Sequence, residues 1–151
     1  MITPMGDRVM LGGGEIEWSD WAPWTSIPYI SEVIPEGPGV YEVARKGQAD
    51  GKRLQIGKTI HLRVHLLDNL LGDTRESAVG GRIMAHEDVT YLLVRWAEIE
   101  KHHAAKRELV NLHLAQFGCY PEYDDMHSGG TARLSVDLTA TRFGPLPRHP
   151  W

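Results

Sequence analysis

The stretch Gly39–Leu66 constrains the fold more than any other part of the chain. A short apolar segment, Gly39–Val43, enters a polar turn that contains glycine, and a second segment, Arg53–Gly57, follows it. This pattern predicts a β-hairpin. The pair Lys58-Thr59 then opens an amphipathic helical pattern. We therefore expect two strands to meet the start of a helix, with Tyr41, a lysine and a histidine gathered at a small catalytic or phosphate-handling site.

Further elements follow the hairpin. Apolar residues at helical spacing over 59–71 predict a helix that ends near Gly72, and 72–81 has the composition of a surface loop. The β-branched and aromatic segment 89–97 predicts a central strand. A second amphipathic helix is predicted over 102–117, with Gly118 ending it. The order hairpin, helix, strand, helix predicts an α+β fold with a small, mostly antiparallel sheet.

The two ends of the chain are less regular. Residues 1–36 contain Trp18, Trp21 and Trp24 at three-residue spacing, and Tyr29–Val33 is short enough for one helical turn. Packing of these tryptophans over the sheet is favoured over base stacking, because the surrounding charge is acidic. Near the other end, the alternation at 133–138 predicts a late strand.

This organisation suggests three parts of one globular unit. They are an N-terminal extension packed on the core (1–36), a central domain (37–126), and a C-terminal strand with a proline-rich tail (127–151).

Length and composition favour an ordinary globular protein. A chain of 151 residues with 42% hydrophobic and 24% charged residues is most simply one domain and is not disordered. No apolar run approaches the roughly 20 residues that span a bilayer, and no secretory signal is recognisable at the start. Cys119 is the only cysteine, which excludes an intrachain disulfide and a four-cysteine zinc site. We expect a reducing, cytoplasmic setting and no membrane partner.

The charge is unevenly distributed. The net charge of −4 argues mildly against a dedicated nucleic-acid binder. Residues 1–36 hold six acidic residues and one basic residue, a balance of −5, whereas 42–65 hold six basic and two acidic residues, a balance of +4. The basic side chains of the second stretch could attract phosphate, although hairpin turns are also basic for solubility alone. These side chains are Arg45, Lys46, Lys52, Arg53, Lys58 and Arg63.

Four pieces of the chain, in this order, resemble the GIY-YIG endonuclease family. They are Gly39-Val40-Tyr41, then Gln55-Ile56-Gly57-Lys58-Thr59 with its following helix, then the helix that carries Glu108, and finally Pro121-Glu122-Tyr123-Asp124. Together they span residues 38–124, more than half of the chain. The resemblance implies that fold and hydrolysis of nucleic-acid phosphodiesters, with DNA as the first expectation.

The resemblance also implies roles for single residues. Tyr41 would act as general base or orient the attacking water, helped by a neighbouring cation such as Lys58, because the pKa of a free tyrosine is near 10. Glu108 would hold one Mg²⁺ or Mn²⁺, with waters and phosphate oxygens completing the shell. The catalytic set implied by the resemblance is therefore Tyr41, Lys58, His65 and Glu108.

Two positions depart from the family's pattern. The tyrosine of the second motif is Gln55 here, which forms hydrogen bonds but cannot titrate. The arginine of the family's helix falls on His65, which is mostly neutral at pH 7 and lacks a guanidinium. Arg63 cannot replace it, because two residues along a helix turn the side chain by about 200°. Asp124 stands where the family has asparagine.

These departures leave two alternatives open. The chain could be a catalytically reduced relative that only binds nucleic acid or a protein partner. His61 and His65, one helical turn apart, could instead form a transition-metal site with Glu108. Against the metal site, at least one of these histidines is more simply a surface or hydrogen-bonded residue. Tyr41 could likewise be a core residue, and Glu108 a solvated one.

Overall fold

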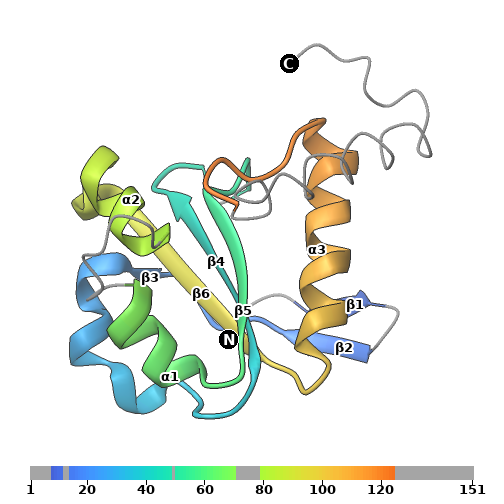
Figure 1. The fold of residues 1–151 in the computed structure, drawn as a ribbon, viewed down its shortest axis with the longest axis horizontal. Helices are drawn as coiled ribbons and strands as arrows, with labels where there is room; N and C mark the ends of the chain where they lie inside the picture. Colours follow the sequence, from blue (N-terminus) through green and yellow to red (C-terminus); the bar gives the residue numbers. More distant parts are fainter. Residues whose placement is uncertain (1–7, 12–13, 49, 71–78, 125–151) are drawn as a thin grey trace, which may run out of the picture.

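The structure, a computed structural model, describes residues 8–11, 14–48, 50–70 and 79–124. Its centre is a four-stranded antiparallel sheet in the order β3-β6-β4-β5, accompanied by a separate two-stranded sheet, β1-β2 (Figure 1). The protein is therefore α+β with small antiparallel sheets, as the sequence predicts.

The predicted hairpin is formed by β4 (Gly39–Arg45) and β5 (Gln55–Thr59). Tyr41 pairs with Gly57, and Val43 with Gln55. β5 begins two residues later than predicted and includes the Lys58-Thr59 pair, so this pair extends the strand and does not open the helix. The turn between the strands contains Gly47 with a φ of 82°, a left-handed conformation that glycine adopts without a steric penalty.

The helix after the hairpin begins at Leu62. A short α-helical turn, α1 (Leu62–Val64), continues as a π-helical segment, η3 (His65–Leu70). Leu62 and Leu66 are fully buried, so the predicted apolar spacing does face the core. The predicted end near Gly72 lies outside the described residues.

A helix that the sequence analysis missed follows. Residues 79–81, predicted as the end of a loop, form the first turn of α2 (Val79–His86); the rest of that predicted loop falls outside the described residues. Two adjacent glycines concealed this helix, because glycine is a poor helix former. Burial of Ile83 in the core accounts for the helix in spite of them.

The later elements agree with the prediction. The strand β6 (Leu92–Glu98) is paired on both sides, by β3 and β4, and residues 89–91 before it form a 3-10 turn, η4 (Val89–Tyr91). The helix α3 (His102–Phe117) has the predicted bounds and ends at Gly118, whose φ of 77° is left-handed. The strand predicted at 133–138 lies outside the described residues.

The N-terminal stretch has more structure than the sequence suggests. Its strands are β1 (Arg8–Leu11), β2 (Gly14–Glu17) and β3 (Ala22–Pro23), followed by the 3-10 helices η1 (Trp24–Tyr29) and η2 (Ser31–Val33). Trp18 and Trp24 are buried, at 1% and 3% exposure, so these two tryptophans do pack on the core as expected.

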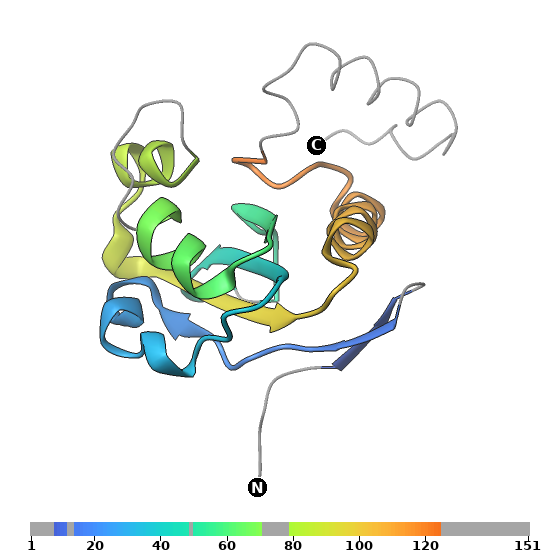
Figure 2. The ribbon, with the colours of Figure 1, turned by 60° about the horizontal axis from the view of Figure 1, so that its bottom comes forward.

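The four-stranded sheet carries an apolar core on each face. One core contains Tyr41, Val43, Leu62, Leu66 and Ile83, and the other contains Val40, Ile56, Leu109 and Val110. Adjacent residues of a strand point to opposite faces. α1, η3 and α2 therefore cover one face, here called the α1 face, and α3 covers the other, the α3 face (Figures 1 and 2).

Candidate functional site

The hydroxyl group of Tyr41 is hydrogen bonded to two other positions of the sequence motifs, Gln55 and His65. It lies 2.9 Å from Nε2 of His65 and 3.1 Å from Nε2 of Gln55, and each pair is hydrogen bonded. Tyr41 is on β4, Gln55 is at the start of β5, and His65 begins η3. We call these three residues the Tyr41 trio. It lies on the α1 face, and Tyr41 and Gln55 are each 3% exposed.

Gly57 makes room for this arrangement. A Cβ atom added at Gly57 would overlap the Tyr41 ring near its hydroxyl end. The ring therefore crosses β5 over a residue with no side chain, which brings its hydroxyl to Gln55 and His65. The tilted rings of Tyr41 and His65 have centroids 5.2 Å apart. The glycine at position 57 thus has a steric reason in this fold.

Lys58, which the resemblance groups with Tyr41, points toward α3. It follows Gly57 on β5 and so faces the side of the sheet opposite to the Tyr41 ring. The positive charge of Lys58 is the largest of the causes that lower the pKa of His103, in the first turn of α3. Lys58 therefore lies near the start of α3 and apart from the Tyr41 trio.

Glu108 is also on the α3 side. It is half-buried and lies outside the buried stripe of α3, which contains Ala105, Leu109, Val110, His113 and Leu114. Of the four residues grouped in the sequence analysis, the structure brings Tyr41 and His65 together. Lys58 faces the other side of the sheet, and Glu108 belongs to α3.

The placement of Glu108 bears on the expected metal ion. Among the described residues, no three His, Cys, Asp or Glu side chains gather as metal ligands. His61 is exposed and precedes α1 as its N-cap, so it does not share a helical face with His65. The described residues therefore do not fit a His61–His65–Glu108 site. A single carboxylate can still hold Mg²⁺ through waters and phosphate oxygens.

The arginines expected to bind nucleic acid are engaged within the protein. Arg45 pairs with Glu87 at 2.8 Å and Glu122 at 3.2 Å, and the hydrogen bond from Arg45 holds the pKa of Glu87 below its usual range. Arg53 pairs with Glu42 at 2.8 Å, and Arg63 with Glu36 at 2.6 Å.

The lysines of the hairpin turn are more available. Lys46 lies 6.0 Å from the centre of the Tyr91 ring, and both Lys46 and Lys52 are exposed. The hairpin therefore offers less uncompensated charge than its composition suggests.

A basic cluster at the start of α3 was not recognised in the sequence. The pKa of His103 is lowered by Lys58, then by burial, and then by His102 and Arg107. The two histidine rings lie 4.4 Å apart. Lys58 lies far from His102 and His103 along the chain, so the sequence alone does not group them. We call Lys58, His102, His103 and Arg107 the α3 basic cluster.

A buried charge network on the α3 face was likewise missed. The carboxylate of Glu42, 4% exposed, accepts hydrogen bonds from Arg53 at 2.8 Å and from Arg95 at 2.9 Å. The guanidinium of Arg95 lies 4.3 Å from the ring centre of Trp18 and 4.6 Å from that of Trp21. Two of the three N-terminal tryptophans thus stack on arginine, which ties the N-terminal stretch to the sheet.

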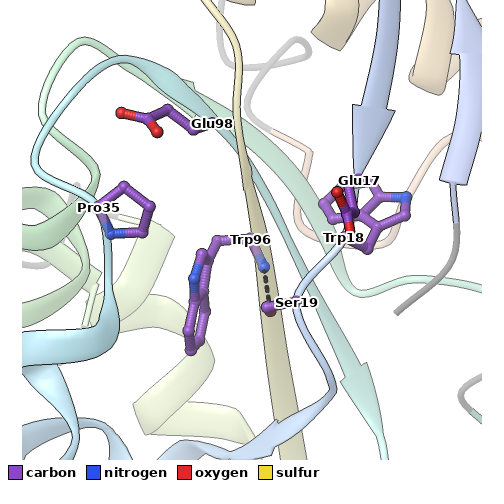
Figure 3. Close-up of a pocket in the computed structure, with 6 residues that line it drawn as sticks. All are labelled: Glu17, Trp18, Ser19, Pro35, Trp96 and Glu98. Carbon is purple, nitrogen blue, oxygen red and sulfur yellow. Dashed lines mark hydrogen bonds between the residues drawn. The ribbon is translucent and has the colours of Figure 1, made fainter. Parts of the chain in front are cut away.

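One open pocket of about 430 Å³ lies beside the C-terminal part of β6. It is lined by Glu17, Trp18, Ser19, Pro35, Trp96 and Glu98 (Figure 3). Ser19 borders it and accepts a hydrogen bond from the backbone N–H of Trp96 at 3.0 Å. Because both ionisable side chains are carboxylates, this pocket disfavours a phosphate group.

Comparison with protein-family models, with curated proteins and with solved structures finds no match to this chain. Within the part of the chain that the structure describes, no helix is both long and apolar enough to cross a membrane.

Proposed function

We propose that this chain is a divergent GIY-YIG-type protein that acts on nucleic-acid phosphodiesters through Tyr41 and His65. The observation that carries the proposal is the Tyr41 trio. Positions 41, 55 and 65 correspond to three functional positions of the resembled family, and they meet at one phenolic oxygen, within 2.9 and 3.1 Å. Gln55 and His65 lie 14 and 24 positions from Tyr41 in the sequence, so it is the packing of the hairpin against the helix that brings them to its hydroxyl.

The fourth piece of the resemblance supports the same arrangement. The backbone N–H of Tyr123 donates a hydrogen bond to the carbonyl of Leu54 at 2.6 Å, directly before β5. Asp124, at the asparagine position of the family, is 2% exposed. Residues 121–124 thus lie against the start of the second motif, so pieces distant in sequence are adjacent in the fold.

The chemistry follows from the side chains present. A phenol can orient a water molecule and, once deprotonated, accept its proton, while a protonated imidazole can bind a phosphate oxygen. A divalent ion on Glu108 would supply positive charge for a phosphate group. Among the described residues, no cluster of three metal ligands lies beside Tyr41.

The test is cleavage of single-stranded, duplex and branched DNA with Mg²⁺ or Mn²⁺, between about pH 6 and 9, where histidine and a perturbed tyrosine titrate. Tyr41→Phe should reduce cleavage by about 10²- to 10⁴-fold, the usual contribution of a positioned acid or base. Tyr29→Phe is the matched control, because Tyr29 is 83% exposed. Cleavage that is indifferent to Tyr41→Phe, or absent from all substrates, would contradict the proposal.

Two further variants divide the proposal into parts. His65→Arg restores the guanidinium of the resembled family and should increase cleavage sharply if the position is correctly assigned. Glu108→Ala should abolish metal-dependent cleavage if Glu108 holds the ion. Activity that survives Glu108→Ala would remove the metal role of Glu108 and leave that of Tyr41 intact.

The position of Lys58 and Glu108 favours a second candidate, in which the chain binds nucleic acid without cutting it. The α3 basic cluster would then bind the phosphate backbone. Binding should weaken with salt, and Lys58→Glu should reduce the slope of log K against log salt by about 0.9 for each phosphate of duplex DNA that the variant no longer neutralises. Lys46→Glu, in the hairpin turn, is the control. Binding of this kind with no turnover would select the second candidate over the first.

A further inference from the structure

His113 uses both of its ring nitrogens to hold backbone groups. It lies on α3 and is 4% exposed. Its Nε2 accepts a hydrogen bond from the backbone N–H of Arg53 at 2.9 Å, and its Nδ1 donates to the carbonyl of Cys119 at 2.7 Å. A backbone N–H only donates and a carbonyl only accepts, so the ring is neutral and carries its proton on Nδ1. Cys119 begins the segment 119–124, here called the return segment.

The return segment comes back to the point of the sheet that His113 holds. The backbone N–H of Glu122 donates to the carbonyl of Arg53 at 3.3 Å. The N–H of Tyr123 donates to the carbonyl of Leu54 at 2.6 Å, directly before β5. Figure 1 shows the chain running from the end of α3 back to the sheet. His113 therefore bridges the start of β5 and the beginning of the segment that packs against it.

Protonation of the ring would break one side of this bridge. With a proton on Nε2, two N–H groups face each other, and the N–H of Arg53 loses its acceptor. The bond to the Cys119 carbonyl persists, because Nδ1 donates in both states. Burial is the largest cause that lowers the pKa of His113. The positive charges of Arg53 and Lys52 also lower it, whereas the Cys119 carbonyl and the Glu42 carboxylate raise it.

We propose that His113 is a pH-sensitive bridge, which separates from Arg53 in mild acid and lets the return segment open from the start of β5 while the rest of the sheet stays closed. The return segment contains the fourth piece of the resemblance, and β5 contains the second, so acid would separate these two pieces. The proposal goes beyond the proposed function and does not depend on it, because the bridge acts without nucleic acid.

The direction of the pH effect follows from the two states of the ring. In the open state the ring meets water, and its pKa returns toward the ordinary value of 6.5. The open state then binds a proton more tightly than the closed state, so a falling pH favours opening. Below about pH 6.5 the open population should rise with each pH unit by a factor that approaches tenfold, until the closed-state pKa is passed.

One contact that resists opening does not change over this range. The hydroxyl of Tyr123 donates to the carboxylate of Glu87 at 2.9 Å. The hydrogen bond from Arg45 holds the pKa of Glu87 below its ordinary value of 4.5, so this carboxylate stays charged in mild acid. The acid response of the return segment is therefore assigned to His113 and not to Glu87.

Amide hydrogen exchange in the full chain, corrected for the intrinsic pH dependence of exchange, measures the opening. Below about pH 6.5 the protection of the N–H groups of Arg53, Glu122 and Tyr123 should fall together, by up to about tenfold per pH unit. Ile99 is the reference: its N–H donates to the carbonyl of Pro38 at 2.9 Å, directly after β6, and should keep its protection. An equal loss at Ile99 would mean that the whole fold opens. That result, or unchanged protection at the three amides, would overturn the proposal.

The ring of His113 gives a second measurement in the unaltered chain. Long-range ¹H–¹⁵N correlation at about pH 8, where an ordinary histidine is neutral, should show the Nδ1–H tautomer. The ring and the three amides should titrate with one midpoint. The Nε2–H tautomer, or midpoints that differ, would contradict the bridge.

His113→Gln is the matched variant. Its amide oxygen can accept the N–H of Arg53 but does not titrate, so the loss of protection in acid should disappear. A loss that persists in His113→Gln would assign the opening to another group and overturn the proposal. If this variant does not fold, the comparison of midpoints in the unaltered chain decides the question.

Discussion

The ring of Tyr41 lies against Gly57 of the neighbouring strand, in the space that any side chain at position 57 would need. Tyr41 is 3% exposed, so the ring has little freedom to move away. The hydrogen bonds from the Tyr41 hydroxyl to Gln55 and His65 depend on this ring position. The candidate site therefore requires a residue without a side chain at position 57.

Gly57→Ala should therefore destabilise the fold. Overpacking a well-filled site costs about 1–3 kcal/mol, measured as a lower urea midpoint. Gly51→Ala is the control, because a Cβ there would come no closer than 3.4 Å to Gln48, an ordinary contact. In a Tyr41→Ala background the cost of Gly57→Ala should shrink. An equal cost in both backgrounds would show that the strain arises elsewhere.

Glu42→Gln should be strongly destabilising. The change leaves the buried guanidinium of Arg95 and the partly buried guanidinium of Arg53 without this carboxylate, and removing one partner of a buried ion pair typically costs about 3–5 kcal/mol. Glu36→Gln removes an exposed partner of Arg63 and should cost no more than about 1 kcal/mol. Urea unfolding of the two variants compares them directly. Equal costs would mean that the buried network does not stabilise the sheet.

His113 should make stability fall in mild acid. Its Nε2 accepts a hydrogen bond from the backbone N–H of Arg53 at 2.9 Å, which requires that nitrogen to be unprotonated, and Nδ1 donates to the carbonyl of Cys119 at 2.7 Å. Burial lowers the pKa of His113 below its ordinary value of 6.5. The unfolded chain then binds the proton at a higher pH than the folded chain.

The contribution of His113 is consequently complete above about pH 6.5 and is lost as the pH falls from there toward its folded-state pKa. Urea unfolding between about pH 5 and 8 should display this decline, and His113→Gln should flatten it. His102→Gln changes a partly exposed histidine at the other end of α3 and serves as the control. A decline that persists unchanged in His113→Gln would assign it to other groups.

Lys58→Gln should raise the pKa of His103 toward 6.5, because Lys58 is the largest cause of its lowering. An NMR titration of the His103 ring measures the shift without any ligand. Lys52→Gln, which changes an exposed lysine of the hairpin turn, should leave the titration unaltered. If His103 titrates identically in Lys58→Gln, Lys58 does not lie beside α3, and its assignment to the α3 face is wrong.

The elements that the sequence determined by itself are those with a strong local pattern. The hairpin follows from two apolar segments around a polar turn, and α3 from helical spacing stopped by Gly118 in a left-handed conformation. The strand β6 was recognised from its β-branched and aromatic residues, although its first three predicted residues form a 3-10 turn. Local patterns fail where packing overrides them. The glycines of α2 concealed a helix, and β1 and β2 are too short to stand out.

Only the tertiary structure decided which side chains meet. The sequence identified Tyr41, Gln55 and His65 as positions of interest, and the crossing of β4, β5 and η3 joined them. The same sequence grouped Lys58 and Glu108 with them, whereas strand alternation turns Lys58 to the face opposite to the Tyr41 ring, and Glu108 belongs to α3. It also offered six basic residues as one patch, three of which form ion pairs with carboxylates. Periodicity fixes the apolar side of an element, but the face that each element covers depends on contacts between residues far apart in the chain.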